Sequence, residues 1–155
     1  MSNPFIEKQV AKIINEENIE YPKNIALACA WIIANFKGVN IKVFDVSASS
    51  SLCDYNILAS AQNTTQARSI VDELSPNLKK HGQEILSLEG LSDAEWILVD
   101  AGDVIVHLFQ ETARDIFDLD TLWSAYPQVK IPEEYYFSTP NQDEKTPNDN
   151  SNNYF

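Results

Sequence analysis

The stretch "EWILVDAGDVIVHLFQ" at residues 95–110 constrains the fold of this chain more than any other segment. Two aliphatic runs flank a tight Asp-Ala-Gly-Asp turn, a pattern typical of a β-hairpin. Pairing Asp100 with Asp103 across that turn predicts that Trp96 lies opposite His107. A tryptophan, a histidine and two aspartates inside a hairpin require an explanation, because a hairpin that only filled a core would need none of them.

Side chains alternate between the two sides of a strand, so the hairpin has two distinct faces. One face is aliphatic and is expected in the core; it contains Ile97, Val99, Val104, Val106 and Leu108. The other face mixes aromatic, imidazole, aliphatic and carboxylate groups, a composition common at protein-binding surfaces. Its members are Trp96, Leu98, Asp100, Asp103, Ile105, His107 and Phe109. The alternative is that helices cover this face too, which would make Trp96 and His107 satisfied core residues.

Helical and strand-like patterns alternate along the rest of the chain. Asn3-Pro4 begins a helix, and the next helix, at 24–36, is apolar almost all round and must therefore be buried, with Gly38 as its C′ residue. Short β-branched segments predict strands at 41–46, 54–61 and 84–90, and helices are expected after Asn63 and at 112–123. The order α-α-β-β-α-β-β-β-α predicts an α/β (α+β) fold with a mixed sheet of about five strands flanked by helices.

The length of 155 residues fits one domain with terminal extensions. We expect an N-terminal helical extension at 1–22, a folded domain at 23–126 and a disordered tail, rich in Asn, Pro and acidic residues, at 127–155. No apolar run approaches the roughly 20 residues of a membrane span, and the N-terminus is unlike a signal peptide. With two cysteines and no Cys/His grouping, a cytoplasmic location without membrane contact is expected.

The net charge of −12 argues against nonspecific binding to nucleic acid, which depends on basic side chains that neutralise phosphates. The charge is concentrated at residues 84–120, which hold ten acidic residues and one basic residue, Arg114. Two interpretations remain open. The acids form a solubilising surface, or they form a surface suited to a basic partner, such as a protein that itself binds nucleic acid.

Candidate catalytic patterns are present but do not assemble. Asp100 with Asp103, and Asp118 with Asp120, could in principle hold a hard cation, yet the first pair flanks a turn and the second lies two residues apart on an expected helix. The serine-rich loop has no G-x-S-x-G elbow, and the four glycines form no phosphate-binding loop. The sequence therefore predicts a protein that is not an enzyme, with no catalytic residues, no metal and no cofactor.

Three segments resemble the ribosomal silencing factor family, also called Iojap-like, over roughly residues 24–124: "KVFDVSASSSLCDYNILASA", "TTQARSIVDEL" and "LEGLSDAEWILVDAGDVIVHLFQETARDIFDLDTLW". The positions that carry the resemblance are Asp45-Val46, Asp54-Tyr55, Ala59-Ser60, Glu89-Gly90, Glu95-Trp96, Asp100, Gly102-Asp103-Val104, Val106-His107, Asp118-Leu119 and Leu122-Trp123. Ala61 departs from the pattern, in which glycine is usual. The N-terminal helix and the Asn-rich tail lie outside the common core.

The resemblance implies a nucleotidyltransferase-like fold without that activity. It further implies binding to the large ribosomal subunit through its ribosomal protein fourteen, which sterically blocks joining of the small subunit and represses translation under nutrient limitation. Trp96 is then the expected anchor, with Glu95, Asp100, Asp103 and His107 as its polar surroundings and no direct sequence-specific contact with nucleic acid. Two alternatives remain: a metal-dependent nucleotidyltransferase-like enzyme, and a scaffold that forms a homodimer off the ribosome through the same face.

Overall fold

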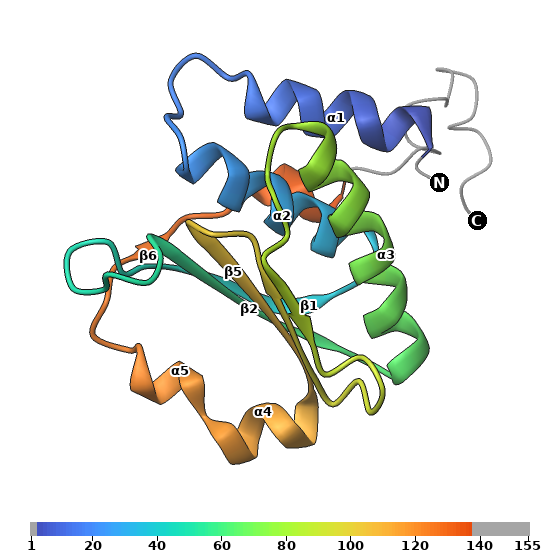
Figure 1. Cartoon of the computed structure of the whole chain (residues 1–155), viewed down its shortest axis with the longest axis vertical. Helices are drawn as coiled ribbons and strands as arrows, with labels where there is room; N and C mark the ends of the chain where they lie inside the picture. The colour runs from blue at the N-terminus through green and yellow to red at the C-terminus, as the bar shows by residue number, and fades with distance from the viewer. Residues whose placement is uncertain (1–2, 138–155) are drawn as a thin grey trace, which may run out of the picture.

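A computed structural model of the chain describes residues 3–137. Two helices precede two strands, and a third helix then leads into the hairpin and two short helices (Figure 1). The elements are α1 (Pro4–Ile14), α2 (Lys23–Asn35), β1 (Val39–Asp45), β2 (Tyr55–Ala61), α3 (Thr64–Lys80), β3 (Ser87–Glu89), β4 (Trp96–Asp100), β5 (Val104–Gln110), α4 (Glu111–Phe117), α5 (Leu119–Leu122), β6 (Gln128–Val129) and the 3₁₀-helix η1 (Glu133–Tyr136).

The strands form one mixed sheet in the order β3-β4-β5-β2-β1-β6. Only β2 and β5 run parallel to each other, and every other neighbouring pair is antiparallel. Helices α2 and α3 lie over one face of the sheet with α1 packed outside α2, whereas α4 and α5 lie under the other face (Figure 1). The expected α/β mixed sheet is confirmed, with a sixth strand, β6, in addition to the five expected.

The main core lies between the sheet and α2. Trp31 is 2% exposed within it, as the all-round apolar pattern of that helix predicts. The aliphatic hairpin face joins this core as expected, and its side chains are all almost fully buried: Ile97, Val99, Val104, Val106 and Leu108.

The hairpin register differs from the expectation. Trp96 lies opposite Phe109, and His107 lies opposite Leu98, so the predicted pairing of Trp96 with His107 is wrong. The pairing is displaced by two residues, an even number, which keeps every side chain on the face predicted for it.

The turn explains this displacement. The Ala101 N–H donates to the Val104 carbonyl at 3.0 Å, so the two-residue loop is Gly102-Asp103, one residue later than expected. Gly102 has a φ of +91°, a conformation that glycine adopts without steric cost. The Asp100 carboxylate accepts the Gly102 N–H at 2.9 Å and fixes the loop at this position.

Helix α2 ends differently from its sequence pattern. Lys37, with a φ of +70°, takes the left-handed position assigned to Gly38. The Gly38 N–H instead donates to the Ile33 carbonyl at 2.8 Å, the second bond of a Schellman ending. A Cβ atom at Gly38 would collide with the Ile33 side chain, so glycine is needed for close approach rather than for a positive φ.

The single helix expected at 112–123 is two short helices. Asp118 has a φ of +50° and separates α4 from α5. Its carboxylate accepts the Thr121 hydroxyl at 2.9 Å and caps the second helix, a role that favours Asp at a helix start over a helix interior.

Both expected domain boundaries need correction. Ile6 and Val10 of α1 are buried in the main core, so this helix is part of the domain rather than an appendage. Residues 128–136 are also ordered: Val129 pairs with β1, and Tyr135 is 8% exposed against the same core. The tail interpretation is wrong for this segment because its apolar residues Val129, Ile131 and Tyr135 pack against the main core. Residues 138–155 lie outside the described part. Within residues 3–137, no helix is both long and apolar enough to cross a membrane.

Candidate functional site

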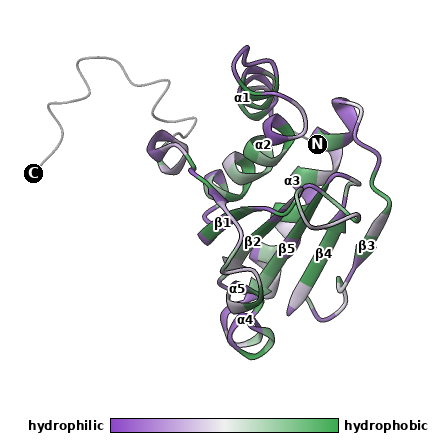
Figure 2. Ribbon diagram, turned by 90° about the vertical axis from the view of Figure 1, so that its left-hand side faces the viewer, coloured by the Kyte–Doolittle hydropathy of each residue, from purple (hydrophilic) through white to green (hydrophobic). Residues whose placement is uncertain are grey.

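The second hairpin face belongs to a smaller apolar cluster beneath the sheet, which α4, α5 and the chain leading to β6 cover in part (Figure 2). Phe109, Leu58 and Phe44 form its buried centre. Trp96, Ile105 and Trp123 pack around that centre and are only partly buried. The face is therefore neither a free surface nor a closed core.

A chain of hydrogen bonds crosses this cluster. The Trp96 indole Nε1 donates to Nδ1 of His107 at 3.1 Å, and the other ring nitrogen of His107 lies 3.2 Å from Asn56 Oδ1. Since an indole only donates and an amide oxygen only accepts, the imidazole is the neutral tautomer with its proton on Nε2. Burial agrees with this state, because it lowers the pKa of His107 from 6.5 to about 4.

His107 thus takes the role of a satisfied core residue that the alternative interpretation gave it, and Phe109 is buried beside it. His107 is 6% exposed and Phe109 is 0% exposed. Phe109 is a core residue, and its expected place among partner-contacting residues is wrong. The reason is that α4 and Trp123 pack against this part of the sheet, with the Trp123 ring 5.4 Å from the imidazole.

Trp96 lies at the boundary between this buried part and solvent. Its ring is 5.0 Å from that of Phe109 on the inside and 4.7 Å from that of Phe117 on α4. Phe117 is itself 52% exposed. Trp96 therefore keeps an accessible edge while its N–H is used internally.

The other expected residues surround this edge. Leu98, Ile105 and Asp100 are half-buried, and Glu95 and Asp103 are exposed. We define the docking face as the accessible apolar residues together with these acids: Trp96, Leu98, Ile105, Phe117 and Trp123, with Glu95, Asp100 and Asp103.

A hollow of about 490 Å³ opens on the docking face between the serine-rich loop and Trp123, with Leu98 and Ile105 in its wall. The Cys53 thiol beside it has a pKa raised to about 11, by burial first and then by the carboxylates of Asp100, Asp54 and Asp103. A thiol in this state is a weak nucleophile, so the hollow is an electronegative recess and not a cysteine active site.

Two basic side chains, Arg114 and Lys42, are engaged internally with Asp120. Arg114, 4% exposed, donates through Nε and Nη2 to both carboxylate oxygens of Asp120 at 2.9 Å, and Lys42 contacts the same carboxylate at 2.9 Å. Nη1 of Arg114 also donates to Ser60 Oγ and to the Asn40 carbonyl. These hydrogen bonds, from Arg114 above all, lower the pKa of Asp120 to about 2.

Sequence reasoning missed the roles of Arg114 and Asn56. A signal existed for each: Arg114 is the one base among ten acids, and Asn56 is an amide within an otherwise apolar strand. The acid pairs considered as cation ligands have other partners, since Asp118 caps α5 and Asp120 pairs with Arg114. Across residues 3–137, no three His, Cys, Asp or Glu side chains are grouped so as to hold a metal ion.

Comparison with known proteins identifies the same family that the sequence motifs on this face resemble. Residues 19–154 match the family described as "Ribosomal silencing factor during starvation". The chain belongs to this family. The match begins before α2 and extends beyond β6 and η1, well past the segment that carried the resemblance in the sequence.

Individual family members show the same relationship. The chain is 39% identical over 88 residues to the ribosomal silencing factor of Haemophilus influenzae, covering 57% of this chain and 86% of that protein. A solved structure from Bacillus halodurans superposes with a TM-score of 0.60 at 28% identity, covering 69% of this chain and 96% of that one. A mouse protein named "Mitochondrial assembly of ribosomal large subunit protein 1" is 25% identical over 88 residues, covering 55% of this chain and 39% of that protein.

Proposed function

We propose that this protein binds the large ribosomal subunit through ribosomal protein fourteen, blocks joining of the small subunit and represses translation under nutrient limitation. The proposal rests on membership of the silencing factor family, and the name of the mouse relative connects a similar chain with the large subunit. On this proposal the chain acts by occupying a surface, without catalysis and without a cofactor.

The observation that carries the proposal is an apolar docking face with an acidic rim. Leu98 and Ile105 offer contact area, while Glu95 and Asp103 are exposed beside them. In the described residues, the ion pairs include neither Glu95 nor Asp103, although Asp103 accepts a hydrogen bond from the Tyr21 hydroxyl at 2.8 Å. On this proposal the exposed rim acids attract a basic ribosomal protein and repel the phosphates of neighbouring RNA.

Within the docking face, we assign the anchor to Trp96 and the surrounding contacts to Leu98, Ile105 and Phe117. A half-buried aromatic ring that is held from behind loses little side-chain entropy when it binds, which is why such rings dominate interface energetics. His107 acts from the second layer, since its Nδ1 fixes the orientation of the indole.

The test is sucrose-gradient sedimentation of purified ribosomal subunits with the protein. Wild type should travel with the large subunit and reduce the fraction of joined ribosomes. Leu98→Lys places a positive charge on the docking face and should weaken co-sedimentation at least tenfold. Leu88→Lys is the matched control, because Leu88 lies on the adjacent strand β3 but projects to the opposite face.

Three results would contradict the proposal in different ways. If the wild-type protein stays at the top of the gradient, it does not bind the ribosome and the whole proposal is wrong. Equal defects in Leu98→Lys and Leu88→Lys would show that the docking face is not the surface that contacts the ribosome. Binding to the subunit without binding to isolated ribosomal protein fourteen would assign the contact to another component. Concentration-dependent sedimentation of the free protein, lost in Leu98→Lys, would show that the same face forms a homodimer off the ribosome.

A further inference from the structure

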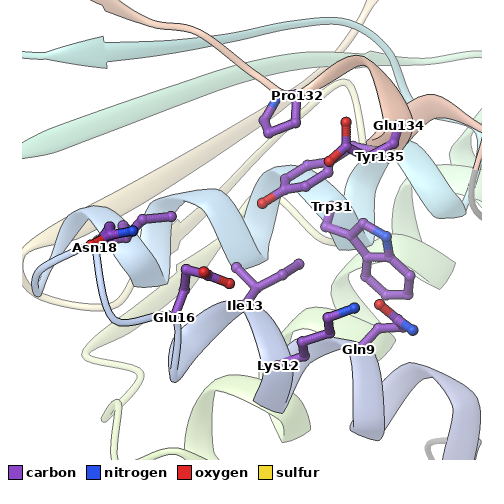
Figure 3. A pocket seen from close by; sticks show the side chains of 10 residues that line it. Gln9, Lys12, Ile13, Glu16, Asn18, Trp31, Pro132, Glu134 and Tyr135 are labelled. Atoms are coloured by element: carbon purple, nitrogen blue, oxygen red, sulfur yellow. The ribbon is translucent and has the colours of Figure 1, made fainter.

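A second hollow, of about 440 Å³, lies on the helical side of the sheet, away from the docking face (Figure 3). Its walls come from α1, the start of the α1–α2 connection, α2 and η1. Its volume is within the range of roughly 300–1,000 Å³ typical of small-molecule sites. The function proposed above makes no use of it.

The base of this hollow is apolar and rigidly held. Ile13 of α1, Trp31 of α2 and Tyr135 of η1 line it, and each is at most 8% exposed. Burial, then the carboxylates of Glu134 and Glu16, raises the pKa of Tyr135 to about 12, so the phenol stays protonated. Trp31 and Tyr135, from separate elements, line the hollow through small accessible edges, against which a flat apolar ligand would lie.

The rim carries charges of both signs. Lys12 lies on α1 and Glu16 just after its end, and Glu134 lies across the opening on η1 (Figure 3). The ion pairs found among residues 3–137 include none of these three side chains. One ammonium and two carboxylates therefore surround an apolar base without neutralising one another.

We propose that this hollow binds a free amino acid with an aromatic side chain. The ring would contact Trp31 and Tyr135, the ligand ammonium would pair with Glu16 and Glu134, and the ligand carboxylate would pair with Lys12. Charge-assisted hydrogen bonds to the adjacent ammonium and carboxylate of the amino acid use all three rim charges, whereas an amine or an acid alone leaves one sign unpaired. This site is independent of ribosome binding.

The experiment titrates the full chain with phenylalanine, phenylethylamine and 3-phenylpropionate, observed by NMR of the tryptophan indole N–H groups. Phenylalanine should bind saturably with a dissociation constant below about 1 mM. It should shift the signal of Trp31, assigned with Trp31→Phe, and leave Trp96 and Trp123 unchanged. The two analogues should each bind at least tenfold more weakly because each lacks one charge.

Paired variants on α1 and just after its end identify the rim contacts. Lys12→Gln and Glu16→Gln should each weaken phenylalanine binding at least fivefold. Lys8→Gln and Glu17→Gln remove equivalent charges from exposed positions that do not line this hollow, and they should bind like wild type. Absence of saturable binding, a shift of Trp96 or Trp123 instead of Trp31, or equal effects in the test and control variants would overturn the proposal. None of these results would affect the sedimentation test on the docking face.

Discussion

The Trp96 indole donates to Nδ1 of His107 at 3.1 Å, so a partly exposed aromatic ring is oriented by a buried imidazole. The bond requires the neutral form of the histidine, because a protonated imidazole has no acceptor nitrogen. The accessible edge of the docking face and the protonation state of a core residue are therefore linked.

This link predicts a pH-dependent stability. The folded pKa of His107, about 4, lies below the ordinary histidine pKa of 6.5, so the unfolded chain takes up the proton more readily. The stabilisation is complete above pH 6.5 and is lost as the pH falls towards 4; the loss between pH 7 and pH 5 should be about 2 kcal/mol. Denaturant unfolding at several pH values measures it. His107→Gln should flatten this slope, and an unchanged slope in that variant would contradict the role of His107.

Replacement of Trp96 should separate anchoring from folding. Trp96→Phe keeps a ring against Phe109 and Phe117 but removes the indole donor, so we expect a folded protein whose ribosome affinity falls at least tenfold. Trp96→Ala should weaken binding by about 2–4 kcal/mol as well. Circular dichroism and sedimentation check both properties. An unfolded Trp96→Phe protein would show that Trp96 is chiefly a core residue. Undiminished ribosome binding would show that Trp96 is not the anchor.

The sequence predicted which residues share the docking side of the hairpin, but not how deeply each is buried. The alternation of side chains along a strand assigned each residue to a face. This assignment remained correct although the predicted register was wrong, because the register error was an even number of residues. The register itself depended on the bond from the Gly102 N–H to Asp100, which hydrophobic patterning does not encode. The burial of Phe109 depended on where the chain after β5 folds back, and that is decided by the left-handed conformation of Asp118.

The acidic rim predicts salt-dependent association. If Glu95 helps to attract a basic partner, the association rate with the large subunit should fall as salt rises, because exposed charges are screened over a Debye length of about 8 Å at physiological ionic strength. Glu95→Gln should reduce both the rate at low salt and its salt dependence. Glu17→Gln removes the same charge from an exposed position in the α1–α2 connection and should change neither. Stopped-flow mixing measures the rates, and a wild-type rate that is independent of salt would refute this role for the rim.

The Arg114–Asp120 pair should fix the chain segment that carries Trp123. Arg114→Leu leaves Asp120 with Lys42 alone and breaks the contacts to Ser60 and Asn40, so we expect a stability loss of about 2–4 kcal/mol, less than for a fully buried pair because Asp120 is 23% exposed. Lys42→Gln breaks only the more exposed contact and should cost at most about 1 kcal/mol. Chemical denaturation measures both variants. Equal losses would mean that the guanidinium holds α5 no more firmly than the lysine does. The expected order would make Arg114 the residue that holds α5, and with it Trp123, in place beside the buried His107.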